Sequence, residues 1–166
     1  SMDRWADDYT SVSAQEKAPN MIPKFAELKQ TYKDFKLLIS VGGWTRGDGF
    51  NAMVNSAANR TTFVNSVKDF LTKYPQFDGI DLDWEYPTSS AAEISSSPED
   101  TGNFTKLMQD LRKVLGNELL LTFASAASAE YVDFKAVEPY VDFVNIMAYD
   151  MATAPKHHSA LYESEI

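Results

Sequence analysis

The chain has 166 residues, a length that suffices for one domain with a sizeable hydrophobic core. Its formal net charge is -9, and the lysines and arginines are scattered rather than clustered. An acidic chain without a basic stripe is not expected to bind nucleic acid, and no apolar run is long enough to span a membrane. The absence of cysteine excludes disulfides, thiol nucleophiles and thiolate metal sites.

Helix and strand patterns alternate along the chain. The opening, residues 1–20, has little periodicity and is predicted to be a loop, as are residues 45–51, 88–98 and the tail after residue 150. Apolar residues spaced three and four apart predict helices over 21–32, 60–74, 100–115 and 131–138. Short apolar runs predict buried strands over 36–41, 77–85, 119–124 and 141–147. Ser97 or Asp100 is expected to cap the third helix, and Gly116 to end it.

Strands that alternate with amphipathic helices indicate a parallel α/β sheet with helical crossovers. Two architectures have this pattern, a doubly wound open sheet and part of a (β/α)8 barrel. No glycine-rich phosphate loop follows any of the predicted strands, so a nucleotide-binding doubly wound domain has no support from the sequence.

The most informative segment is the second predicted strand, which carries a row of acids. Because side chains alternate along a strand, Asp81, Asp83 and Glu85 should share one face, roughly 6.6 Å apart along the strand. The intervening apolar residues should point to the other face. Packed carboxylates repel one another, so at least one should hold a proton near neutral pH. Glu85, nearest the carboxyl end of the strand, is the member best placed to act as a general acid.

Acids of this kind also cap helices, pair with lysines or hold a magnesium or calcium ion. We favour the catalytic interpretation over the metal site, because three acids on one face of an apolar strand do not fit a solvated surface. Asp78 should face the opposite way and precedes Gly79, so we assign it to the turn that enters the strand.

Asp78, Asp81, Asp83 and Glu85 together form the pattern D-x-x-D-x-D-x-E, which resembles the signature of glycoside hydrolase family 18 on the fourth barrel strand. The motif also resembles that of the chitinases of this family in its adjoining residues, which are Gly79, Trp84, Tyr86 and Pro87.

Two further segments carry the same resemblance. Ser40-Val41-Gly42-Gly43-Trp44 is similar to the S-x-G-G motif of the third strand, and Met147-Ala148-Tyr149-Asp150 to the M-x-Y-D motif of the sixth. The resemblance therefore implies a partial TIM barrel of about strands three to six. Because a complete barrel takes about 250 residues, residues 1–166 are expected to be a fragment of a family 18 catalytic domain.

The resemblance also implies an activity, the hydrolysis of β-1,4-linked N-acetylglucosamine in chitin or chitooligosaccharides by a substrate-assisted retaining mechanism. In that mechanism Glu85 protonates the leaving oxygen and Asp83 orients the acetamido group of the sugar. Asp81 shares a proton or hydrogen bond with Asp83, and Tyr149 donates its hydroxyl to the acetamido carbonyl. Without the motif, Tyr149 would be interpreted as a core tyrosine.

Four more residues are assigned to substrate binding. These are Trp44, Met147, Asp150 and Tyr86, although core packing suits Trp44 equally well. Ser40, Gly42 and Gly43 are expected to be structural and to let the backbone pass close to the acids. No cofactor or metal is expected, and the adjacent His157 and His158 are interpreted as solvent-exposed.

Several alternatives stay open. The same motif serves endo-β-N-acetylglucosaminidases that act on N-glycans, and lectin-like relatives bind sugar without cleaving it, although these usually lack the acid glutamate. A half barrel could also associate with a copy of itself to cover its sheet edges. The resemblance further implies a secreted protein.

Overall fold

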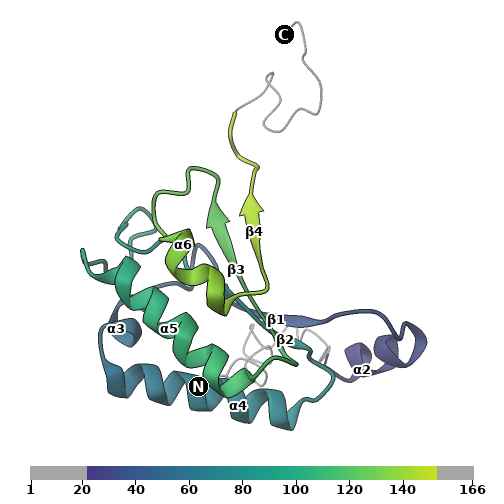
Figure 1. Ribbon diagram of the computed structural model, residues 1–166. Coiled ribbons are helices and arrows are strands. Elements are labelled where there is room, and N and C mark those ends of the chain that lie inside the picture. Colours follow the sequence, from purple (N-terminus) through teal and green to yellow (C-terminus); the bar gives the residue numbers. More distant parts are fainter. Residues whose placement is uncertain (1–21, 153–166) are drawn as a thin grey trace, which may run out of the picture.

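The computed structural model of this protein describes residues 22–152 (Figure 1). Its elements alternate between helix and strand as the sequence predicted. They are α2 (Ile22–Thr31), β1 (Leu38–Gly42), α3 (Phe50–Val54), α4 (Ala57–Lys73), β2 (Gly79–Asp83), α5 (Asp100–Leu115), β3 (Leu120–Ala126), α6 (Phe134–Val137), the 3-10 helix η1 (Glu138–Tyr140) and β4 (Phe143–Met147). The predictions for residues 1–20, His157 and His158 concern residues outside the described range.

The four strands form one parallel sheet whose spatial order is β1-β2-β3-β4. An order that follows the sequence is that of a (β/α)8 barrel, whereas a doubly wound sheet reverses its order at a switch point. The structure thus decides between the two predicted architectures in favour of a partial barrel. β1 and β4 are the outer strands of the described sheet.

The hydrophobic core lies between the sheet and the helices α4 and α5, which run side by side in Figure 1. From the strands, Ile80, Leu82, Leu121 and Phe123 are completely buried. The helices contribute a stripe of residues at three- and four-residue spacing, including Val64, Val67, Phe70, Phe104, Leu107, Met108 and Leu111. This core holds one face of β2 against the helices, and the other face is left for polar side chains.

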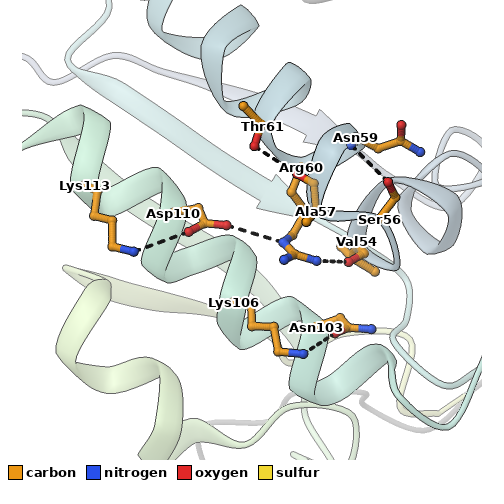
Figure 2. A network of polar contacts seen from close by, with 10 residues as sticks. All are labelled: Val54, Ser56, Ala57, Asn59, Arg60, Thr61, Asn103, Lys106, Asp110 and Lys113. Carbon is orange, nitrogen blue, oxygen red and sulfur yellow. Dashed lines mark hydrogen bonds and ion pairs between the residues drawn. The ribbon is translucent and has the colours of Figure 1, made fainter.

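A polar network joins α4 to α5 at the edge of this core (Figure 2). The Arg60 guanidinium donates to the Val54 carbonyl at 2.6 Å and pairs with Asp110 of α5 at 3.4 Å. Ser56 caps α4, because its hydroxyl accepts a hydrogen bond from the Asn59 backbone N–H. The Arg60–Asp110 pair thus links the two helices at the edge of the core.

Several boundaries differ from the sequence-based expectations. The predicted loop 45–51 contains the start of α3, which has only one helical turn and so leaves little periodic signal. The second strand ends at Asp83 rather than Glu85, and the last predicted helix is reduced to α6 and η1. The expected cap by Ser97 or Asp100 is wrong, because α5 begins after Glu99 without a side-chain cap. In residues 22–152, no helix is both long and apolar enough to cross a membrane.

Candidate active site

The two faces of β2 differ as the alternation predicted. Ile80 and Leu82 on the helical side are inaccessible to solvent, and Trp84 just beyond the strand is 2% exposed. Asp81 and Asp83 lie on the opposite face and are only partly buried, and Glu85 follows two residues after the strand ends. Each acid therefore lies on the side of the sheet that the helices leave open.

Asp81 is the innermost acid, and side chains from the three other strands hold its carboxylate. It accepts hydrogen bonds from Ser40 of β1 at 2.8 Å, from Thr122 of β3 at 2.6 Å and from Asn145 of β4 at 3.1 Å. The resemblance implied a hydrogen bond to Asp83, but these hydrogen bonds of Asp81 go to the three neutral side chains instead. These three hydrogen bonds therefore hold the Asp81 side chain in place behind Asp83.

Asp83 lies in the middle of the row and is held differently. Its Oδ1 atom is buried and, within the described residues, has no hydrogen-bond partner. Burial raises the pKa of Asp83 to about 6, and the nearby charges of Glu85 and Asp81 act in the same direction. The sequence predicted that at least one acid of the row holds a proton near neutral pH, and the raised pKa of Asp83, caused first by burial and then by its two acidic neighbours, agrees with that prediction.

The glycine pair at the end of β1 allows this close packing. A Cβ on Gly42 would lie 2.1 Å from the Asp83 carbonyl oxygen, and Gly42 has a φ of +117° that suits glycine. The Gly43 N–H donates to the same carbonyl at 2.7 Å. The predicted structural role of Ser40, Gly42 and Gly43 is confirmed, since each contacts or passes close to an acid of the row.

Glu85 contacts the residue that follows it. The Tyr86 hydroxyl donates to Glu85 Oε2 at 3.1 Å, and the Tyr86 ring stacks on that of Tyr131, with centroids 4.7 Å apart and planes inclined by 8°. Tyr131 follows β3 and was assigned to a helix by the sequence analysis, which missed it as a site residue. The signal that could have found it is an aromatic residue just beyond the carboxyl end of the neighbouring strand.

The remaining predicted site residues lie at the same end of the sheet. Trp44 follows β1 and is 49% exposed, so it is not the core residue that the sequence also allowed. Tyr149 follows β4 and is 53% exposed, which likewise rules out a core tyrosine. Met147 ends β4 partly buried, and Asp150 is exposed with a φ of 54°. In residues 22–152, no three His, Cys, Asp or Glu side chains gather as metal ligands would.

A sequential parallel sheet with acids at the carboxyl ends of its strands is the arrangement of (β/α)8-barrel enzymes, whose active sites lie at that end. A sequence model described as "Glycosyl hydrolases family 18" matches residues 1–166. The chain therefore belongs to glycoside hydrolase family 18.

Individual relatives agree with this family. Chitinase A1 of Niallia circulans is 43% identical over 150 residues, which cover 84% of this chain and 21% of the relative. The chitinase domain of the spore coat protein CotE from Clostridium difficile superposes with a TM-score of 0.80 at 32% identity, over 89% of this chain and 45% of that domain. A family 18 N-acetylglucosaminidase from Paenibacillus barengoltzii superposes with a TM-score of 0.74 at 38% identity, over 78% and 41% of the two chains. The chain thus spans about a fifth of the first of these relatives and less than half of each solved structure.

Proposed function

We propose that residues 1–166 are one segment of a family 18 catalytic barrel that hydrolyses β-1,4-linked N-acetylglucosamine in chitin or chitooligosaccharides. The observation that carries this proposal is the row Asp81, Asp83 and Glu85, with a buried oxygen on Asp83 that has no hydrogen-bond partner in the described part of the chain. An unpartnered acceptor inside a site is a suitable partner for the N–H of a substrate acetamido group. The relatives named as chitinases support the same substrate class.

The proposed reaction is substrate-assisted. Glu85 protonates the glycosidic oxygen as the bond to the anomeric carbon breaks, and the acetamido oxygen of the same sugar attacks that carbon. Asp83 accepts a hydrogen bond from the acetamido N–H and stabilises the positive charge that develops there, while Asp81 lies behind Asp83. Water then opens the oxazolinium ring with net retention, and Glu85 takes up the proton of that water.

The other site residues bind and orient the sugar. Tyr149 donates its hydroxyl to the acetamido carbonyl, and its exposure leaves that hydroxyl accessible to a ligand. Trp44 offers an exposed indole face on which a sugar ring can stack, and Met147 and Asp150 complete the subsite. Because chitin lies outside the cells that degrade it, we also propose that the protein is secreted.

The decisive experiment is Glu85→Gln in the natural full-length protein, assayed on a fluorogenic chitobioside. Loss of the acid should lower kcat by about 10²–10⁴-fold, with little change in ligand binding. Asp83→Asn and Tyr149→Phe should also lower kcat more than they weaken binding. Turnover that survives Glu85→Gln would contradict the hydrolase proposal, and sugar binding with no turnover in the unaltered protein would favour the lectin-like alternative.

A second candidate is the cleavage of N-acetylglucosamine linkages in N-glycans, because endo-β-N-acetylglucosaminidases share the acid motif carried by β2. The same acids would perform it, so the two candidates differ only in substrate. Parallel assays on chitooligosaccharides and on a high-mannose glycopeptide separate them, because a chitinase should release sugar only from the first.

We further propose that the 166-residue segment on its own associates with a second copy and is inactive. On the outer strand β4, Phe143 is 49% exposed and Ile146 on the opposite face is 52% exposed, an unusual degree of exposure for strand residues. Sedimentation velocity over a range of concentrations tests this, and a monomer at every concentration would contradict it.

A further inference from the structure

The contact between Tyr86 and Glu85 has a definite direction. Burial and the charge of Glu85 raise the pKa of Tyr86 to about 12, so its hydroxyl keeps its proton at any pH where the protein works. The hydroxyl therefore donates to Glu85 Oε2, at 3.1 Å. Because Oε2 is already occupied as an acceptor, the transferable proton of Glu85 belongs on the other oxygen, Oε1.

The Tyr86 ring is held by a residue from a different loop. It stacks almost parallel on Tyr131, with the ring centroids 4.7 Å apart. The Tyr131 carbonyl in turn accepts a hydrogen bond from the Thr101 hydroxyl of α5, at 2.9 Å. A stacked ring can rotate little without losing this contact, so Tyr131 limits the directions in which the Tyr86 hydroxyl can point.

The first turn of α5 also anchors the loop that carries Tyr86. The completely buried Asp100 accepts a hydrogen bond from the Thr88 backbone N–H at 3.2 Å and from the Ser97 backbone N–H at 2.8 Å. Asp100 and Thr101 are adjacent in sequence, so one turn of helix fixes both partners of the tyrosine stack. The orientation of the Tyr86 ring is therefore set both by its stack on Tyr131 and by the hydrogen bonds that Asp100 accepts from its loop. Neither contact involves the substrate.

We propose that Tyr86 is a positioning residue for Glu85, and that Tyr131 holds Tyr86 in the orientation from which its hydroxyl reaches the carboxyl group. This inference rests on the proposed role of Glu85 as general acid and deepens it. The sequence alone assigns Tyr86 to substrate binding and gives Tyr131 no role at the site.

The chemical consequence is a fixed direction of proton transfer. Glu85 Oε1–H gives its proton to the glycosidic oxygen as the C–O bond breaks, and the carboxylate that remains keeps its hydrogen bond from Tyr86. A hydrogen bond to a charged carboxylate is stronger than one to its neutral form. The titratable groups around Glu85 are Asp83 on β2 and Tyr86 itself, with Tyr131 and Glu130 behind the tyrosine ring.

Tyr86→Phe in the natural full-length protein tests the hydroxyl, because phenylalanine keeps the stacked ring. On a fluorogenic chitobioside we expect kcat to fall about 10-fold with KM within about 2-fold. Since the bond that favours the carboxylate is lost, the basic limb of the kcat/KM profile should move to higher pH by about half a unit. Tyr140→Phe, which removes a tyrosine hydroxyl bonded to Gln109, is the matched control and should change none of these values.

Substitutions of Tyr131 test the second layer. Tyr131→Leu removes the stack and should reproduce part of the loss in kcat, about 3-fold, while Tyr131→Phe keeps the ring and should restore activity. The double variant Tyr86→Phe, Tyr131→Leu should be no slower than Tyr86→Phe alone, because Tyr131 acts through the hydroxyl that is already gone. Circular dichroism and thermal unfolding on each variant identify any that fails to fold. If Tyr131→Leu does not fold, the activity of Tyr131→Phe decides whether the ring of residue 131 is sufficient.

Two results would overturn the inference while leaving the proposed function intact. One is a Tyr86→Phe effect confined to KM with an unmoved basic limb, which would make Tyr86 an ordinary substrate contact. The other is an additive double variant, which would make Tyr131 independent of Tyr86. Failure of the proposed function is recognised separately, by turnover that survives Glu85→Gln.

Discussion

The two ends of β2 carry aspartates in opposite circumstances. At the amino end, Asp78 accepts hydrogen bonds from the Lys29 ammonium at 2.6 Å and the Leu37 N–H at 2.7 Å. Burial alone would raise the pKa of Asp78, but these bonds outweigh it and hold the pKa below its usual range. At the other end, Asp83 has a buried oxygen without a partner and a raised pKa. Five residues apart, one acid stabilises the fold and the other destabilises it.

The arrangement at the amino end of β2 is repeated two crossovers later, at the amino end of β4. Asp142, just before β4, accepts from the Leu121 N–H at 2.7 Å and from Arg112 of α5 at 2.6 Å. Its own N–H donates to the Leu121 carbonyl, as that of Asp78 donates to the Leu37 carbonyl. Each aspartate ties the start of its strand to the preceding strand and to a helix, so the amino end of the sheet sets the register. At the carboxyl end, in contrast, Asp83 has a buried oxygen with no hydrogen-bond partner among residues 22–152, and this is the end where a substrate can interact.

The largest change in stability is expected from Asp78→Ala, which removes the paired acid at the amino end of β2. The variant leaves Lys29 and the Leu37 N–H without their shared acceptor, and we expect it to reduce the free energy of unfolding by about 3 kcal/mol. Asp34→Ala, at an exposed aspartate that precedes β1, is the control and should change stability by less than about 0.5 kcal/mol. Chemical denaturation measures the free energy of unfolding of both variants. Equal effects would show that Asp78 does not set the register of β2.

Asp142→Ala should act in the same direction but less strongly, by about 2 kcal/mol. The reason is that Arg112 keeps three other acceptors, the carbonyls of Tyr140, Gly116 and Leu119. Denaturation curves of the Asp78 and Asp142 variants measured together check the order. A larger loss at Asp142 would contradict the equivalence of the two aspartates.

Asp83→Asn should instead stabilise the fold, and only above a defined pH. Because the pKa of Asp83 is higher in the fold than in the unfolded chain, the acid costs stability as pH rises from about 4 through about 6. A rise in pKa of this size corresponds to roughly 3 kcal/mol in a fully shielded group, and access of water reduces it to on the order of 1 kcal/mol. The variant should be more stable at pH 8 and equal to the parent at pH 3.5. A gain that is the same at both pH values would point to a cause other than charge.

The smallest effect on stability is expected away from both ends of β2, at the contact between α4 and α5. Asp110→Asn removes the charge that pairs with Arg60 and Lys113 on a partly exposed surface, and should cost less than about 0.5 kcal/mol. Thermal unfolding at low and high salt measures it, and the difference should vanish at high salt. If Asp110→Asn lowered the free energy of unfolding as much as Asp78→Ala, a paired acid at the amino end of the sheet would be no more important than one between the helices.

The sequence by itself determined which residues of β2 face the helices and which face away. That follows from the two-residue period of a strand, and the burial of Ile80 and Leu82 confirms it. It also predicted the parallel alternation of strands and helices, because the apolar spacings of the two are distinct over more than ten residues. The single turn of α3 escaped prediction, since one turn has no period to recognise.

Only the tertiary structure decided how the acids differ from one another. Asp81, Asp83 and Glu85 look equivalent in the strand, but Ser40, Thr122 and Asn145 come from three other strands and all bond Asp81, leaving Asp83 with a buried, unpartnered oxygen. The stack of Tyr86 on Tyr131 likewise joins residues 45 positions apart in sequence. A pKa or a side-chain orientation depends on neighbours in space, and local periodicity carries no information about which distant segments those neighbours come from.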